Sequence, residues 1–292
     1  AGVFGTTNGT GSAASFGAIR GMDFDSNGDL YVTDVNNHNI RKITPGGVVT
    51  TFAGMSGVSG HQDGNVSSSK FNGPFDLVFD ENDNLYVIEF FGATVRKITP
   101  SGVVSTIAGN PGVVGYADGI GNNALFRSPS GLAYADGFLY ATDQTNSVLR
   151  KISTSGVTTT ISGNPGVFQV TDGTSGAKYL NIYGVAVNSN GIIYVTDLLG
   201  HTVRKLDVIP GCLSTFLLVT DQATNIGRCM SHVFLNDNVA PVITCPPTIT
   251  VNADPGLCTA SGVSLGTATA TDNCNMSITP INNAPTAYAL GN

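Results

Sequence analysis

Leu85-Tyr86-Val87-Ile88-Glu89, followed a few residues later by Val95-Arg96-Lys97-Ile98, is the stretch that decides the fold, because near-copies of it occur four times. The tyrosine recurs at Tyr31, Tyr86, Tyr140 and Tyr194. The Arg-Lys pair recurs at Arg41-Lys42, Arg96-Lys97, Arg150-Lys151 and Arg204-Lys205. Steps of 55, 54 and 54 residues between the tyrosines identify one repeated structural unit.

Each unit is predicted to form four short strands joined by turns. In the second unit we expect strands at 76–79, 85–88, 94–98 and 103–107, with turn sequences at 81–84 and 99–102. Four antiparallel strands without a helix cannot bury both faces of their sheet alone, so such units must stack face to face around an axis. The sequence therefore predicts an all-β fold that contains a β-propeller.

The composition agrees with many short strands and argues against two classes of partner. Of the 292 residues, 41% are hydrophobic, which is enough for a real core, and 11% are charged. The 37 glycines suit tight turns better than helices. With 13 basic residues and a formal charge of −7, the chain offers no basic track for nucleic acid. No apolar run approaches the roughly 20 residues of a membrane helix, so we expect no membrane insertion.

Two segments carry a resemblance to NHL repeats. They are Tyr-Val-Thr-Asp-Val-Asn-Asn-His-Asn-Ile-Arg-Lys-Ile-Thr at 31–44 and Gly-Val-Ala-Val-Asn-Ser-Asn-Gly-Ile-Ile-Tyr-Val-Thr-Asp at 184–197. In register, the resemblance covers roughly residues 1–216. It implies a propeller commonly of six blades, found in lyases, lactone hydrolases and binding scaffolds. Because Ala1-Gly2 aligns with Ala53-Gly54 at the end of a blade, we expect a fragment of a larger chain, with about two more blades upstream.

Polar residues that recur in every unit are interpreted as structural. We expect the Arg-Lys pairs to lie at blade edges and to face solvent or a neighbouring blade. The acid at the end of each second strand is expected to accept N–H groups of the following turn. These acids are Asp34, Glu89, Asp143 and Asp197. His38 and His201 share one repeat position and are interpreted as turn residues, so we expect neither a metal site nor a cofactor.

Departures from the repeat are the better candidates for function. The residues just before the expected innermost strands should ring one mouth of a central channel, and the next residue is Gly in three units but Asp76 in the second. In that same unit Phe90-Phe91-Gly92 replaces the polar turn Val35-Asn36-Asn37, which indicates either a contact patch or packing under a loop. The candidate binding residues are Arg20, Asp76, Phe90, Phe91 and Tyr183.

The cysteines all lie beyond residue 210, which indicates disulfides in an oxidising compartment. We expect Cys212 to bond Cys229 and Cys258 to bond Cys274, because each pair closes a short loop. The predicted organisation is a propeller at 1–216, an exit segment and linker at 217–239, and a second β domain at 240–292.

The second domain resembles the HYR (hyalin repeat) module. The residues that carry this resemblance are Ile243-Thr244-Cys245-Pro246, Gly256-Leu257-Cys258 and Ala270-Thr271-Asp272-Asn273-Cys274. The resemblance implies a partial immunoglobulin-like sandwich, associated with adhesion, that stops before its fourth cysteine. Cys245 is therefore left without an assigned partner.

Two function classes follow from these expectations. The favoured one is a non-enzymatic protein, extracellular or on a bacterial cell surface, whose propeller is a binding or spacer scaffold and whose HYR module serves adhesion. Its partners would be a protein or glycan surface ligand and further domains of the same chain. The alternative is a metal-dependent lyase or lactonase acting at the channel, for which Asp76, Arg20 and Tyr183 are the nominated residues. That alternative rests on analogy of fold.

Overall fold

The computed structural model describes residues 4–172 and 177–206 with their side chains, and beyond these only the backbone of six strands. The chain divides into two compact units, Ala1–Val208 and Ile209–Asn292. Both helices in the described part of the chain are three-residue 3-10 turns, η1 (Gly11–Ala13) and η2 (Val35–Asn37). Neither is long and apolar enough to cross a membrane.

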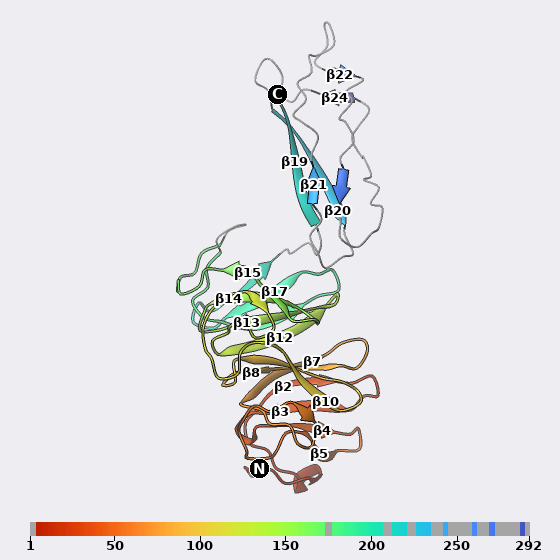
Figure 1. Ribbon diagram of the computed structural model, residues 1–292, viewed down its shortest axis with the longest axis vertical. Helices are drawn as coiled ribbons and strands as arrows, with labels where there is room; N and C mark the ends of the chain where they lie inside the picture. Colours follow the sequence, from red (N-terminus) through yellow and green to blue (C-terminus); the bar gives the residue numbers. More distant parts are fainter. Residues whose placement is uncertain are drawn as a thin grey trace. The chain divides into compact units, whose positions relative to one another are not determined.

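The first unit contains four antiparallel sheets, the blades, one for each sequence repeat (Figure 1). Blade 1 consists of β1 (Gly9–Thr10), β2 (Ile19–Phe24), β3 (Leu30–Asp34), β4 (Asn39–Ile43) and β5 (Val48–Ala53). Blade 2 consists of β6 (Gly64–Asn65), β7 (Pro74–Phe79), β8 (Leu85–Glu89), β9 (Thr94–Ile98) and β10 (Val103–Ala108). Blade 3 consists of β11 (Gly119–Ile120), β12 (Pro129–Ala135), β13 (Phe138–Asp143), β14 (Val148–Ser153) and β15 (Val157–Gly163). Blade 4 contains β16 (Ile182–Val187), β17 (Ile193–Asp197) and β18 (Thr202–Leu206).

The blades confirm the predicted propeller, with one addition. In blades 1 to 3 a two-residue strand from the loop pairs with the outermost strand, so the strand order is β1-β5-β4-β3-β2 and each sheet has five strands rather than four. The four predicted strands of blade 2 agree with β7 to β10 to within two residues. Alternating apolar residues and turn sequences were therefore sufficient to locate them.

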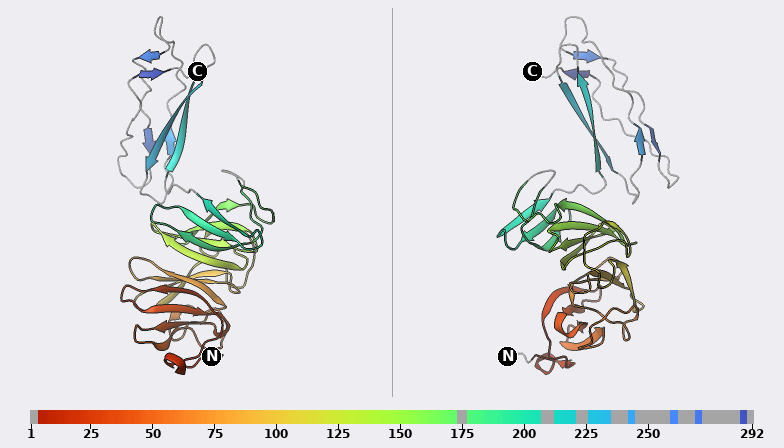
Figure 2. Two further views of the ribbon diagram at one scale, coloured as in Figure 1. Left: turned by 180° about the vertical axis from the view of Figure 1, so that it is seen from behind. Right: turned by 60° about the vertical axis from the view of Figure 1, so that its left-hand side comes forward.

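Neighbouring blades pack face to face in chain order (Figures 1 and 2). The innermost strands β2, β7, β12 and β16 contact one another in series. A cluster of buried side chains lies between each pair of blades, as between blades 2 and 3, where Tyr86 and Leu139 belong to one core. Burial of each large apolar side chain contributes about 1.5–3 kcal/mol, so the interfaces between blades are the core of the unit.

The arginine of each Arg-Lys pair is buried, which corrects the interpretation of these residues as blade-edge groups. Arg150 donates to the carbonyl oxygens of Leu125 (3.0 Å) and Ala117 (2.6 Å) in the loop before its blade. It also pairs with Asp118 and Asp143, both at 2.9 Å. A buried guanidinium must be paired, so the aspartate of the Asp-Gly loop serves as its partner. Equivalent loop contacts are made by Arg41, Arg96 and Arg204.

The acid that ends each second strand binds a different group from the one expected. Asp143 accepts the backbone N–H of Arg127 at 2.8 Å, in the segment that leads into the innermost strand of its own blade. Asp34, Glu89 and Asp197 accept N–H groups at the equivalent place. Of the backbone N–H groups in the following turn, only that of Gly200 reaches its acid, Asp197, among the described residues. The acid therefore fastens the preceding loop to the blade.

The second unit contains three two-stranded sheets in its described part. β19 (Cys212–Thr220) pairs with β20 (Ile226–Phe234), β21 (Val242–Thr244) with β23 (Thr269–Thr271), and β22 (Thr259–Ser261) with β24 (Ala287–Ala289). Residues 213–216, which match the fourth strand of earlier blades, thus lie in a sheet with β20 and not with β18.

The cysteine predictions concern this second unit. The register of β19 and β20 sets Cys212 opposite Phe234 and Cys229 opposite Leu217. Cys212 and Leu217, the residue opposite Cys229, are five residues apart along β19, which corresponds to about 16 Å. A disulfide needs Cα atoms within about 7 Å. In this register the Cα atoms of Cys212 and Cys229 therefore lie too far apart for the predicted disulfide. Cys245, Cys258 and Cys274 lie outside the described residues.

Candidate functional site

Four of the five candidate residues gather around Phe75 at one end of the innermost strands. We call Arg20, Phe75, Phe90, Phe91 and Tyr183 the Phe75 cluster. The ring of Phe75 stacks on Phe90, with centroids 5.0 Å apart, and meets Tyr183 edge-on at 6.0 Å. The guanidinium carbon of Arg20 lies 5.4 Å from the Phe75 centroid. Phe90 contacts Phe91 edge-on at 5.2 Å. The cluster thus joins blades 1, 2 and 4.

The repeat explains why residues from different blades meet here. Arg20, Phe75, Ser130 and Tyr183 occupy one repeat position, which lies within β2, β7, β12 and β16 rather than just before them as expected. Ser130 is small and buried, and its hydroxyl donates to the Tyr183 carbonyl at 2.9 Å. A small residue on blade 3 leaves room for Phe75 of blade 2 and Tyr183 of blade 4 to touch across it.

The turn that carries the two phenylalanines is held by the preceding loop. Phe90 N–H donates to the Gly73 carbonyl at 2.9 Å. Gly73 has a φ of +67°, and a Cβ at this position would lie 2.3 Å from Cδ2 of Phe91. Only glycine suits both this conformation and the approach of the ring. Phe91 remains 53% exposed, so it presents an aromatic face to solvent.

His38 supports the same loop from blade 1. It adopts the left-handed conformation at φ 54°, as expected of a turn residue, and its Nδ1 accepts the Gly73 N–H at 3.1 Å. Burial lowers the pKa of His38, which favours the neutral imidazole that this acceptor role requires. The residue is therefore a positioning group for Gly73.

Asp76 links blade 2 to blade 3. Its Oδ1 accepts the N–H of Leu77 at 2.9 Å and its Oδ2 the N–H of Leu132 at 2.8 Å. Burial is the largest influence on its carboxyl and raises its pKa to about 6, with a further contribution from Asp23. Because a Cβ on Gly21 would lie 2.2 Å from Oδ1 of Asp76, the glycine on blade 1 makes space for this carboxylate.

Blades 1 and 3 form this link with a threonine. Thr33 Oγ1 accepts the Gly21 N–H at 2.9 Å and donates to the Phe75 carbonyl of blade 2 at 2.9 Å. Thr142 makes the same two kinds of contact between blades 3 and 4. Blade 2 has Ile88 at this position, so the carboxylate of Asp76 takes over the connection to its neighbour. The departure from glycine at 76 thus has a structural explanation.

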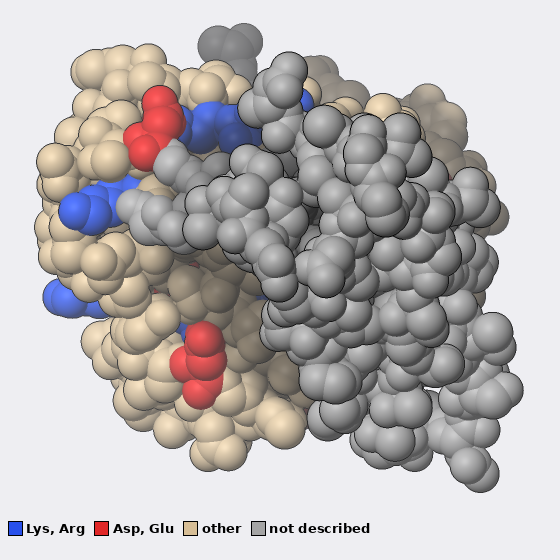
Figure 3. Space-filling model, turned by 90° about the horizontal axis from the view of Figure 1, so that it is seen from above, with Lys and Arg blue, Asp and Glu red and all other residues tan. Residues whose placement is uncertain are grey.

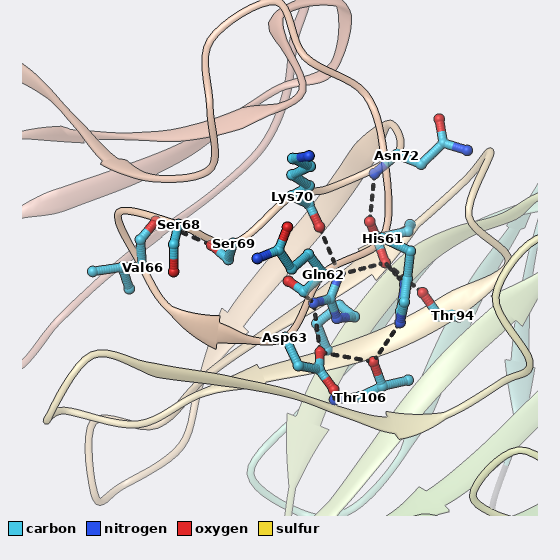
Figure 4. Close-up of polar contacts among 12 residues, drawn as sticks. His61, Gln62, Asp63, Val66, Ser68, Ser69, Lys70, Asn72, Thr94 and Thr106 are labelled. Carbon is cyan, nitrogen blue, oxygen red and sulfur yellow. Dashed lines mark hydrogen bonds and ion pairs between the residues drawn. The ribbon is translucent and has the colours of Figure 1, made fainter.

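A second group of polar side chains, which no sequence pattern indicates, lies on the outer part of blade 2 (Figure 4). His61 Nε2 lies 3.0 Å from Thr106 Oγ1, and its Nδ1 lies 3.8 Å from the buried Glu89. Burial by itself raises the pKa of Glu89. Hydrogen bonds with His61, Thr94 and the Asn72 N–H, together with the charge of Arg96, outweigh it, so the pKa lies below its usual value. His61 stands in a variable loop, and only the fold brings it to Glu89.

Charge around the Phe75 cluster is sparse. Arg20 is exposed, and no carboxylate in residues 4–172 or 177–206 pairs with its guanidinium. On the face drawn in Figure 3, the charged side chains that can be seen among the described residues are few and of both signs. The described residues also contain no group of three or more His, Cys, Asp or Glu side chains that could hold a metal ion.

Comparison with protein families and known sequences identifies the repeat. A match to the NHL repeat covers residues 16–43. A segment of 96 residues is 32% identical to the protein SUPPRESSOR OF QUENCHING 1, chloroplastic, of Arabidopsis thaliana. The match covers 32% of this chain and 9% of that protein, so it spans a small part of the relative's length.

Solved structures share the architecture. A structural genomics protein of unknown function from Bacteroides thetaiotaomicron is 24% identical, with a TM-score of 0.54 over 64% of this chain and 46% of its own. An auxiliary nutrient binding protein from the same organism is 14% identical, with a TM-score of 0.52 over 66% and 48%. The chain spans under half the length of either structure, and the likeness is one of fold. The chain contains an NHL repeat, and its first unit is an all-β propeller unit of four blades.

Proposed function

We propose that this chain is a non-enzymatic extracellular or cell-surface protein whose propeller binds a glycan through the Phe75 cluster. The observation that carries the proposal is the convergence of aromatic rings from blades 2 and 4, with Arg20 of blade 1, at one end of the innermost strands. Binding sites commonly combine aromatic walls with a few polar groups that fix orientation.

The state of Asp76 supports binding rather than catalysis. Each of its carboxylate oxygens already accepts a backbone N–H, one within blade 2 and one from blade 3. A general base needs an oxygen directed at the substrate, and a catalytic metal needs several ligands that converge on it. The carboxylate instead serves the connection between blades.

The size of the exposed surface favours a sugar over a folded protein partner. Phe91 and Arg20 are the exposed members of the cluster, whereas Phe75, Phe90 and Tyr183 are half-buried. A stable protein interface buries about 800 Å² on each partner, far more than these side chains offer. One or two sugar rings match an exposed phenylalanine ring and an exposed cation of the same cluster.

A glycan array followed by titration calorimetry on the full chain tests the proposal. We expect a glycan that binds the natural sequence and loses at least 10-fold in affinity with Phe91→Ala, because the ring supplies the stacking face. Phe168→Ala removes a ring of similar exposure (55%) from a loop outside the cluster and should leave binding unchanged. Equal losses in both variants, or no binding of any glycan, would contradict the proposal.

We also propose that the four blades belong to a six-bladed ring in a longer secreted chain with an HYR-type adhesion module. Met22 on blade 1 is 60% exposed, whereas its repeat equivalent Leu77 is 2% exposed under the previous blade. Val203 on blade 4 is 70% exposed, whereas Val95 is fully buried under the next blade. Further blades would cover both faces. The mass of the natural protein tests this: 30.0 kDa would exclude extra blades.

A further inference from the structure

Arg20 differs from the repeated arginines in having nothing to neutralise it. Arg41, Arg96 and Arg150 are fully buried and pair with carboxylates of their own blades. Arg20 is exposed, and among the described residues its side chain makes no hydrogen bond or ion pair and one ring contact, with Phe75. In a chain of formal charge −7, an exposed cation without a described carboxylate partner, beside an aromatic cluster, is a feature that requires a reason.

The ring contact prepares Arg20 for an anion. A guanidinium that stacks on an aromatic face is held in one plane, with its N–H groups directed outward at the edge. That edge matches the two oxygens of a carboxylate, to which arginine donates two parallel hydrogen bonds. Because Phe75 already limits the motion of the side chain, less entropy is lost when the anion binds.

Two further groups define the remainder of the ligand. Phe91 presents an exposed ring that reaches Phe75 through Phe90, so an apolar face lies on the same cluster as the cation. The hydroxyl of Tyr183 has no hydrogen-bond partner among the described residues, and its ring lies 6.0 Å from Phe75. The ligand should therefore combine a ring with apolar C–H faces, hydroxyl groups and a single carboxylate.

We infer that the glycan bound at the Phe75 cluster is an acidic sugar, with its carboxylate on Arg20 and its ring on Phe91. This inference rests on the proposed function, because it names the ligand class of the same site. A uronic acid has all three features on one ring. A phosphorylated sugar would bring close to two negative charges to one arginine on an acidic protein, which makes the monoanionic carboxylate the better match.

Titration calorimetry with trigalacturonic acid and with its methyl ester tests this on the full chain. The ester keeps the rings and hydroxyls and removes the charge. We expect the acid to bind at least 10-fold more tightly than the ester. We also expect 0.5 M NaCl to weaken the binding of the acid but not that of the ester. Arg20→Gln should bring the affinity for the acid to that of the ester, whereas Arg127→Gln, at another exposed arginine, should change neither.

The outcomes separate the two proposals. If acid and ester bind equally and both are lost in Phe91→Ala, the site binds glycans but the inference of an acidic sugar is wrong. If Arg20→Gln leaves the preference for the acid intact, the inference is wrong as well. If neither ligand binds, the inference fails, and the glycan array decides whether the proposed function fails with it. Circular dichroism melting curves of each variant establish that it is folded.

Discussion

Blades 2 and 3 are built on the same repeat, yet each connects to the next blade through a different group. Blade 3 uses the hydroxyl of Thr142, which donates to the Tyr183 carbonyl of blade 4. Blade 2 has an isoleucine at that position and uses Asp76, whose carboxylate accepts the Leu132 N–H of blade 3. In blade 2, a departure from the repeat at one position, Ile88, is thus compensated by a departure at another, Asp76. The two departures have to be considered together before a function is assigned to either residue.

Blade 2 also differs from blade 3 in a feature that is separate from the connection between blades, its aromatic turn. Its turn carries Phe90 and Phe91, whereas the corresponding turn of blade 3 is polar, with Asn146 donating to Asp143 at 2.8 Å. The blade-to-blade connection does not require the aromatic turn, because Asp76 makes that connection by itself. The aromatic turn is therefore the part of blade 2 to which we assign the proposed ligand binding.

The largest expected effect concerns what the two blades share, the buried arginine. Arg150→Ala should lower the free energy of unfolding by about 3–5 kcal/mol, because Asp143 would remain buried without its counter-charge. Arg127→Ala, at an exposed arginine of the same blade, should change it by less than about 0.5 kcal/mol. Urea unfolding followed by circular dichroism measures both. Equal effects would show that burial of Arg150 is not what stabilises the loop.

A double-mutant cycle that converts blade 2 to the pattern of blade 3 tests whether Asp76 compensates for Ile88. Asp76→Gly and Ile88→Thr should each cost about 1–3 kcal/mol, the first by leaving the Leu132 N–H unpaired. The double variant should cost at least about 1 kcal/mol less than the sum, because a threonine at 88 regains the hydroxyl connection. Urea unfolding of the four proteins measures the coupling. Strict additivity would mean that the two departures are independent.

A smaller effect is expected in the pH dependence that Asp76 contributes. Its folded pKa of about 6 lies above its ordinary value of 3.8, so between these values the folded state holds a proton that the unfolded state has lost. The free energy of unfolding should therefore decrease as pH rises from about 4 to about 6. Relative to Asp76→Asn, which does not titrate, we expect a decrease on the order of 1–2 kcal/mol across this window. Parallel pH profiles of the two proteins would show that the pKa of the Asp76 carboxyl is not raised.

The sequence predicted the blades well because their determinants are local and repeated. Alternation of apolar residues and turn sequences located the strands of blade 2, and the recurrence of Tyr86 and its equivalents set the register from blade to blade. The buried position of Arg96 could not be predicted in this way. Its partners are carbonyl groups of a loop 26 and 34 residues earlier in the chain, and only the folded structure brings that loop over the blade.

The sequence pattern indicates which residues depart from the repeat, but not how they are arranged, and their binding role stays a prediction. Arg20, Phe90 and Tyr183 stand at a shared repeat position or at a break in the repeat, and they gather around one ring. Asp76 is also a break in the repeat, but its role as a connection between blades depends on the backbone N–H of Leu132, which no side-chain pattern reveals. Contacts between blades are set by packing, which spacing within one repeat does not encode.

Calorimetric titration of a blade 2 variant tests the central claim most directly, that the aromatic turn binds the ligand while Asp76 holds the blade. Phe90→Val combined with Phe91→Asn gives blade 2 the side chains that blade 1 has at Val35 and Asn36 and leaves Asp76 in place. We predict at least a 10-fold loss of affinity for trigalacturonic acid, with a urea midpoint close to that of the natural sequence. Unchanged affinity in the folded variant would contradict the claim.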